Sequence, residues 1–155
     1  MDRLDGFRIM TAAGCDWDDA MALAWRTFLR FEAADYEEEG IRNFLDFITD
    51  PRLERMFLLG EYKMLIAKAE GKIIGMITLR NVYHISLLFV DAEYQKMGIG
   101  KALVHALYQT AGAGKLTVFA SPYGIPFYHR IGFKDTGREE IRDGIRYTPM
   151  IFEEG

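Results

Sequence analysis

The pattern of hydrophobic and polar positions predicts a series of strands in the middle of the chain. Apolar residues dominate 64–69 and 73–79, on either side of Glu70-Gly71, a pair typical of a hairpin turn. A third apolar run covers 85–90, and such a run before turn residues indicates a strand that is covered on both faces. Another apolar segment, 116–120, follows two glycines. The middle of the chain therefore reads strand, strand, strand, helix, strand.

Apolar residues at helical spacing predict helices around these strands. The helix that begins at Gly98 carries one apolar stripe, which can pack on the sheet. Near the N-terminus, Asp16 is a suitable N-cap for the first helix. The second helix ends before Asp50-Pro51, because proline disfavours the helical conformation of the residue before it. The buried faces of these two helices are expected to comprise Trp17, Ala20, Met21, Ala24, Trp25 and Phe28, and Ile41, Phe44, Leu45 and Ile48.

The remaining segments complete the expected domain. A first strand is predicted at 7–11, and a short helix between Pro126 and Gly132, which suit the first turn of a helix and the left-handed residue after its end. A short helix is also expected at 51–57. A hairpin joins 134–142 to 145–152 through Asp143-Gly144. These elements predict one α/β domain that covers residues 1–155.

Composition and charge narrow the classes of partner. Half of the 155 residues are hydrophobic, which is enough for one sizeable core, and the net charge of -4 argues against a nucleic-acid partner. No apolar run has transmembrane length, and 1–5 lack the layout of a signal peptide, so we expect no membrane partner and a cytoplasmic location. Cys15 is the only cysteine, which excludes an intramolecular disulfide and a cysteine-rich metal site. We expect Cys15 to be a small core residue, and we expect no metal.

The turn between the third strand and the helix is suited to binding a phosphate. Gly98 and Gly100 leave backbone N–H groups accessible, and the positive end of the helix dipole attracts an anion. A P-loop is excluded, because Gln95 and Ala102 stand where that motif has glycine and Ser or Thr. A dinucleotide site is poorly supported, because Leu103 replaces its third glycine.

Two motifs resemble the GNAT superfamily of N-acetyltransferases. The segment 95–100, Gln-Lys-Met-Gly-Ile-Gly, is similar to the family signature Gln/Arg-x-x-Gly-x-Gly/Ala, and Tyr128 precedes Gly132-Phe133 as in a later family segment. Ser121 stands where the family often has asparagine. The resemblance implies a mixed, mostly antiparallel sheet of about six or seven strands, flanked by helices. It also implies a splay between the central strand, 85–90, and the next strand, 116–120.

The resemblance further implies acetyl-coenzyme A as co-substrate. The turn would hold its pyrophosphate, and the end of the central strand would pair with its pantetheine arm, with a backbone N–H near Leu88 polarising the thioester carbonyl. The implied cofactor-binding residues are Leu88, Phe89, Val90, Gln95, Lys96, Met97, Gly98, Ile99, Gly100, Lys101, Ser121 and Tyr128. The alternative reading of the turn is a strand-to-helix connection that binds nothing.

Two side chains are candidates for proton transfer. By resemblance, Tyr128 would protonate the leaving thiolate; the alternative is a packing role with its hydroxyl bonded to backbone. His84 holds the place of a family glutamate and would act as base, directly or through a water near Ser86. A structural histidine with an ordinary hydrogen bond is the other reading of His84. His105 and His129 are expected to be structural.

The resemblance implies an N-acetyltransferase that passes an acetyl group from acetyl-coenzyme A directly to a primary amine in a ternary complex. The acceptor is a small molecule or a protein or peptide amine, and a homodimer is possible by resemblance. A coenzyme A-binding sensor without turnover, or an enzyme for a longer acyl donor, are the alternatives. The acidic run 35–39 is interpreted as a solvated connection, with attraction of a cationic substrate as the other possibility.

Overall fold

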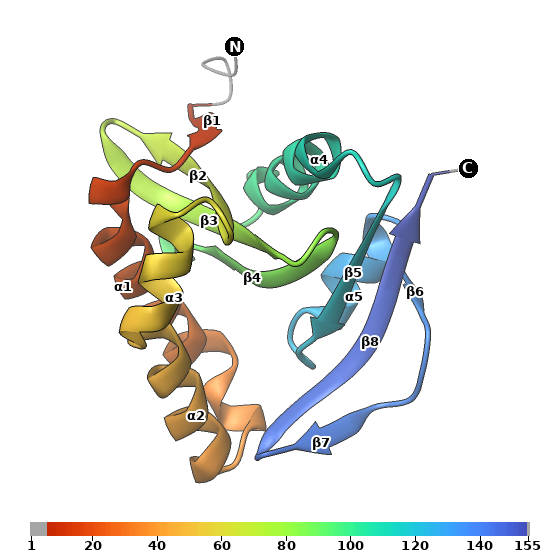
Figure 1. Ribbon diagram of the computed structural model, residues 1–155. Helices are drawn as coiled ribbons and strands as arrows, with labels where there is room; N and C mark the ends of the chain where they lie inside the picture. Colours follow the sequence, from red (N-terminus) through yellow and green to blue (C-terminus); the bar gives the residue numbers. More distant parts are fainter. Residues whose placement is uncertain (1–5, 155) are drawn as a thin grey trace.

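The computed structural model describes residues 6–154 and contains one sheet with the strand order β1-β2-β3-β4-β5-β8-β6, in which β7 also pairs with β8 (Figure 1). The strands are β1 (Arg8–Thr11), β2 (Lys63–Ala69), β3 (Lys72–Arg80), β4 (His84–Val90), β5 (Lys115–Ala120), β6 (Lys134–Asp135), β7 (Glu140–Arg142) and β8 (Ile145–Glu153). The pairing of β4 with β5 is parallel, and the other pairs are antiparallel. The segment 1–5, expected to carry no signal peptide, lies outside the described residues.

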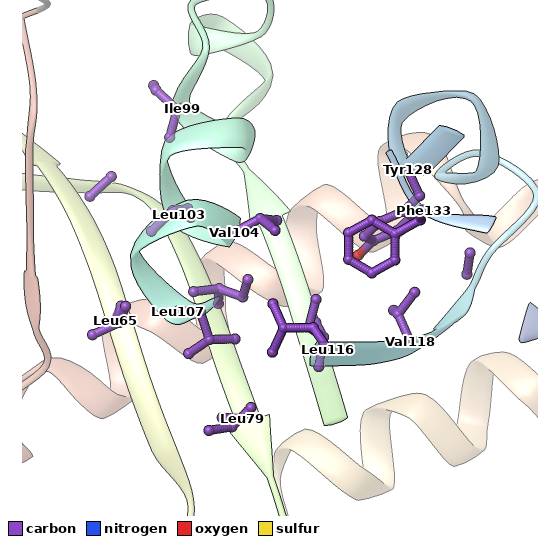
Figure 2. Close-up of a cluster of buried hydrophobic side chains, with 14 of the residues drawn as sticks. Leu65, Leu79, Ile99, Leu103, Val104, Leu107, Leu116, Val118, Tyr128 and Phe133 are labelled. Atoms are coloured by element: carbon purple, nitrogen blue, oxygen red, sulfur yellow. The ribbon is translucent and has the colours of Figure 1, made fainter. Parts of the chain in front are cut away.

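Helices cover both faces of the sheet. One face carries α1 (Trp17–Phe31), α2 (Glu38–Ile48) and α3 (Pro51–Leu58), and the other carries α4 (Ile99–Ala111) and α5 (Ile125–Arg130). Figure 2 shows the second face, where Leu103 and Leu107 of α4 pack over the strands and Tyr128 lies beside Phe133. Because each helix buries one apolar stripe, the expected packing of amphipathic helices on a covered sheet is confirmed.

The two halves of the sheet are joined at one end only. Parallel pairing of β4 with β5 is limited to His84 with Thr117 and Ile85 with Val118, after which the two strands diverge (Figure 1). The remainder of β4 keeps its antiparallel partner β3 up to Val90. The predicted splay is therefore present, and the predicted fold class of a mixed, mostly antiparallel sheet flanked by helices is confirmed.

The turn between β7 and β8 is seated against the start of α2. The N–H of Glu37 donates to the carbonyl of Gly144 at 3.3 Å, and the Asn43 amide donates to the Asp143 carbonyl at 2.9 Å. A Cβ atom on Gly40 would collide with the Gly144 backbone, so glycine is required for this approach. This contact joins the α1–α2 region to the far half of the sheet.

Three local predictions need correction. The predicted strand 134–142 is interrupted between β6 and β7, because Pro149 of β8 accepts from the Thr136 N–H but has no N–H to return to that side. Eight strands result instead of six or seven. Asp16 stands at the N-cap of α1, but its carboxylate accepts from the Ala13 N–H at 2.7 Å and makes no capping bond to α1. Cys15 is exposed and is not a core residue.

Two kinds of feature are absent from residues 6–154. No helix in that range is long and apolar enough to cross a membrane. Within the same residues, no group of three or more His, Cys, Asp and Glu side chains is arranged to hold a metal ion.

Candidate active site

The divergence of β4 and β5 opens into a cavity of about 1580 Å³. Its walls come from both halves of the sheet, from the ends of α1 and α2 and from α5. Of the residues predicted from the sequence, those that line this cavity are His84, Leu88, Phe89, Val90, Gln95, Lys96, Gly98, Ile99, Gly100, Lys101, Ser121 and Tyr128. Met97 does not line the cavity, and its side chain is exposed.

The backbone of β4 presents hydrogen-bonding groups to the gap. The Asp91 N–H donates to Ile74 of β3 at 2.8 Å, and the Leu87 N–H donates to the Thr78 hydroxyl of β3 at 3.0 Å. Because backbone groups alternate along a strand, those of Leu88 and Val90 face the opposite side, toward β5. β5 has diverged at that level, so the Leu88 N–H and C=O face the cavity and are available to an extended ligand.

The predicted phosphate turn has the geometry that its glycines imply. Lys96 and Gly98 have φ of 65° and 82°, and the first bond of α4 runs from the Ala102 N–H to the Gly98 carbonyl at 3.0 Å. The N–H groups of the residues between Gly98 and Ala102 therefore have no partner within the helix. The Gln95 amide donates to the Val90 carbonyl at 2.6 Å. Gln95 thus braces the turn against β4 with its side chain.

The two glycines of the turn serve different purposes. A Cβ on Gly98 would meet no atom within 4 Å, whereas a Cβ on Gly100 would lie 3.1 Å from the ring of Phe127. Gly100 therefore allows α4 to approach α5 closely. Gly100 also lines the cavity, so its predicted role beside the pyrophosphate stays a prediction.

Tyr128 lies on α5 with its ring packed edge-on between Phe127 and Phe133, at centroid distances of 5.1 and 5.0 Å. Its side chain is buried but still lines the cavity. Burial, together with the negative charge of Glu32, raises the pKa of Tyr128 above its usual value. The phenol is therefore protonated throughout the neutral range, and it is a weaker acid than an unperturbed tyrosine.

His84 lies where β4 and β5 are still paired. Its Nδ1 atom is 2.8 Å from the Thr117 hydroxyl, and its ring contacts Phe119 edge-on at 4.6 Å. Burial lowers the pKa of His84, with a smaller contribution from the charge of Arg80, so the imidazole is neutral at pH 7. Leu88 is four residues further along the strand, or roughly 13 Å at the usual rise. His84 thus requires a relay to reach chemistry at Leu88.

Polar groups lie between these two positions. The Tyr62 hydroxyl donates to the Ser86 hydroxyl at 2.9 Å and is 2.8 Å from that of Thr78. Ser86 is half-buried and lines the cavity on the same side as His84. Ser86 is therefore a polar group of the cavity lining, and its role in a water path from His84 stays a prediction.

One acidic residue in the cavity was missed by the sequence reasoning. Glu32 follows the last residue of α1 and lines the cavity, with Ser121 close to its carboxyl group. Desolvation raises the pKa of Glu32 from 4.5 to about 7, and this outweighs the opposing effect of Ser121. Residues 35–39 drew attention as an acidic run, but no spacing pattern connects Glu32 to Ser121 or Tyr128. Only the fold brings them together.

The other predicted histidines lie apart from the cavity lining. His129 is exposed and pairs with Asp135 through Nε2 at 2.7 Å, and His105 is exposed on α4. These positions fit the structural roles that the sequence predicted for them.

Comparisons with solved structures give the same architecture. A GCN5-related N-acetyltransferase from Rhodopseudomonas palustris superposes with a TM-score of 0.82 at 25% identity, over 95% of each chain. A PaiA N-acetyltransferase from Thermoplasma acidophilum, solved in complex with coenzyme A, gives a TM-score of 0.79 at 21% identity, over 96% of this chain and 99% of that one.

Comparisons of sequence give shorter matches. The peptidyl-lysine N-acetyltransferase YjaB of Salmonella typhimurium is 39% identical over 69 residues, which are 44% of this chain and 48% of that protein. A glucosamine 6-phosphate N-acetyltransferase of Trypanosoma brucei brucei is 30% identical over 90 residues, 50% of this chain and 61% of that protein. The matched region thus spans about half the length of these relatives.

The family model described as the acetyltransferase (GNAT) domain matches residues 32–154. That range begins at Glu32, includes the turn at Gly98 and the helix with Tyr128, and extends to the end of β8. The chain belongs to the GNAT family of N-acetyltransferases.

Proposed function

We propose that this protein transfers an acetyl group from acetyl-coenzyme A to a primary amine by direct attack within a ternary complex. The observation that carries the proposal is the gap between β4 and β5, where the backbone of Leu88 is unpaired and faces the cavity. An amide-bearing chain that enters this gap would complete the strand pairing that β5 leaves open.

The turn at one end of the cavity fits a pyrophosphate. N–H groups at the start of α4 and the positive end of the helix dipole would bind two phosphates, with Lys96 and Lys101 lining the same region. Relatives of known structure contain coenzyme A or acetyl-coenzyme A, which supports the same co-substrate here. The thioester would then lie near Leu88, whose N–H would polarise its carbonyl.

Two side chains have proposed roles in proton transfer. Tyr128 is the acid that protonates the departing thiolate, since its phenol is protonated and lines the cavity. His84 is a base that acts through ordered water along Ser86, since it is neutral at pH 7 and lies at the closed end of the gap. These assignments divide the chemistry between the two walls of the cavity.

The acceptor is proposed to be an amine on a small molecule or a peptide. Relatives are named for peptidyl-lysine and for glucosamine 6-phosphate, which share only a primary amine. We place the protein in the cytoplasm, where a single free thiol such as Cys15 remains reduced. The homodimer implied by resemblance stays a prediction.

The test has two stages. Acetyl-coenzyme A binding is first measured by calorimetry, and failure to bind refutes the co-substrate. Thiol release is then followed with a panel of amines that includes a lysine peptide, 1,6-diaminohexane and glucosamine 6-phosphate, with acetyl, propionyl and longer donors compared. Acetylation of an amine is the expected result. Tight binding without thiol release for any amine refutes transfer and favours the sensor.

A further inference from the structure

The C-terminal end of α1 reaches across the cavity to the segment that follows β5. Ser121 lies close enough to the Glu32 carboxyl to lower its pKa, and the ring of Phe31 stacks on that of Tyr123 at a centroid distance of 4.9 Å and an interplanar angle of 18°. Ser121 and Tyr123 lead into α5, which carries Tyr128. A carboxylate from the first helix is thereby placed on the same wall as the proposed acid.

Glu32 has no cationic partner in this position. No ion pair involving Glu32 is found within residues 6–154. The titratable groups electrostatically coupled to it are Asp35 on its own side, and the phenols of Tyr36, Tyr123 and Tyr128. Glu32 is half-buried in the cavity wall. A partly buried carboxylate without a counter-ion costs stability, so its presence there calls for a functional explanation.

We propose that Glu32 binds the ammonium group of the acceptor and takes its first proton, so that the acceptor is a cationic aliphatic amine. This proposal rests on the proposed acetyl transfer and specifies its acceptor. The carboxylate supplies the missing half of an ion pair, and the acceptor supplies the cation that the cavity lacks at this point.

The ammonium nitrogen loses two protons when it becomes an amide, so two groups must accept them. The ammonium loses one proton to Glu32, and the free electron pair on nitrogen then attacks the thioester carbon. The C–S bond breaks with its electron pair on sulfur, and sulfur takes the phenolic proton of Tyr128. The new amide nitrogen gives its second proton to His84 through water. Glu32 and His84 release one proton each and Tyr128 regains one, which leaves one proton for each acetyl group transferred.

The proton on Glu32 also prepares Tyr128. Burial raises the pKa of the Tyr128 phenol most, and the negative charge of Glu32 raises it further. When Glu32 becomes neutral, the effect of its charge disappears and the phenol becomes a stronger acid at the stage when sulfur departs. Capture of the amine proton on one residue thus assists delivery of a proton from the other. The pKa of Glu32, about 7, is close to the pH at which such an exchange is efficient.

The surroundings of Glu32 favour an ammonium on an apolar stem. The rings of Phe31, Tyr36 and Tyr123 line this part of the cavity, and aromatic faces accept both methylene chains and cations. The exposed acidic residues that follow on the chain, Asp35 and the run from Glu37 to Glu39, attract cations and repel phosphates. A lysine side chain or a diamine fits this environment better than an anionic amino sugar.

The test compares Glu32→Gln with Glu61→Gln, which removes an exposed acidic charge outside the cavity lining. With Nα-acetyl-lysine methylamide and 1,6-diaminohexane as acceptors, Glu32→Gln should raise the KM for the acceptor about 10- to 100-fold. The acidic limb of kcat/KM near pH 7 should disappear in the same variant. Glu61→Gln should retain both the KM for the acceptor and the limb, and the KM for acetyl-coenzyme A should be unchanged in both variants.

Failure of this proposal is distinguishable from failure of acetyl transfer. If either amine is acetylated but Glu32→Gln keeps the wild-type KM and pH limb, the Glu32 assignment is wrong while the transferase stands. If no amine is acetylated, binding of 1,6-diaminohexane to the coenzyme A-loaded protein is measured by calorimetry at pH 8 and pH 6. Binding that is weaker at pH 6 and lost in Glu32→Gln supports the cation site. Equal binding by wild type and variant overturns it.

Discussion

Glu32→Gln is expected to make the folded protein more stable above neutral pH. A carboxyl whose pKa rises from 4.5 to about 7 on folding contributes stability that is fully present below pH 4.5 and is lost as the pH rises through 7. The difference corresponds to about 3 kcal/mol at high pH. A neutral glutamine avoids this loss, and the weaker interaction with Ser121 offsets about 1 kcal/mol. The net expected gain at pH 8 is therefore about 2 kcal/mol.

Urea denaturation of wild type and Glu32→Gln at pH 5 and pH 8 measures this effect. At pH 8 the free energy of unfolding of the variant should be about 2 kcal/mol higher than that of wild type, which corresponds to a Tm about 4–8 °C higher. At pH 5 the carboxyl is largely protonated in the folded state, so the two proteins should differ by less than about 1 kcal/mol. Equal stability at pH 8, or the same difference at both pH values, would refute the inference that folding raises the pKa of Glu32.

The remaining predictions concern the proposed cofactor and proton-transfer residues. Tyr128→Phe keeps the ring packing and should lower kcat about ten- to a thousandfold with little change in acetyl-coenzyme A affinity. If the variant keeps the wild-type rate of the chemical step, Tyr128 is not the acid. His84→Ala should lower kcat about 10- to 100-fold at pH 7.5 and remove a kcat limb below pH 6.5, whereas His105→Ala on the exposed side of α4 should change neither. Gly98→Ala and Gly112→Ala place a side chain at φ of 82° and 63° and should each cost about 1 kcal/mol of stability. Calorimetry should show weaker acetyl-coenzyme A binding for Gly98→Ala alone, and equal loss in both variants would contradict the phosphate turn.

The central strand and the turn after it could be predicted from the sequence because their signals are local. An apolar run, a glycine turn and an amphipathic helix follow one another from Ile85 to Leu107. The residues of each segment are sufficient to predict its conformation. The hairpin at Glu70-Gly71 is equally local, since Glu70 and Gly71 both adopt positive φ. The conformation of such elements does not depend on the segments that they pack against.

The errors arose where a distant segment decides the conformation. Asp16 has the sequence of an N-cap, but the N–H of Ala13 and the Lys68 ammonium, 3.5 Å away on β2, take its carboxylate instead. The break in the strand 134–142 follows from Pro149, which lies on another strand. Lys68 and Pro149 lie on strands distant in the sequence, so the local pattern around Asp16 or 134–142 does not show them.

Glu32 illustrates the same limit for the candidate site, and Thr27 extends the argument. Thr27 lies on α1 before Glu32, lines the same cavity, and its hydroxyl is buried without a hydrogen-bond partner in the part of the chain that the structure describes. A buried unpaired hydroxyl costs about 1–3 kcal/mol, and an unpaired desolvated carboxylate costs a comparable amount. Thr27 on α1 and Glu32 just after its end are therefore two polar groups that destabilise the fold in the cavity between β4 and β5. Since these groups oppose folding, their position is best explained by a ligand that satisfies them, and the acceptor amine is the ligand that the gap would bring there.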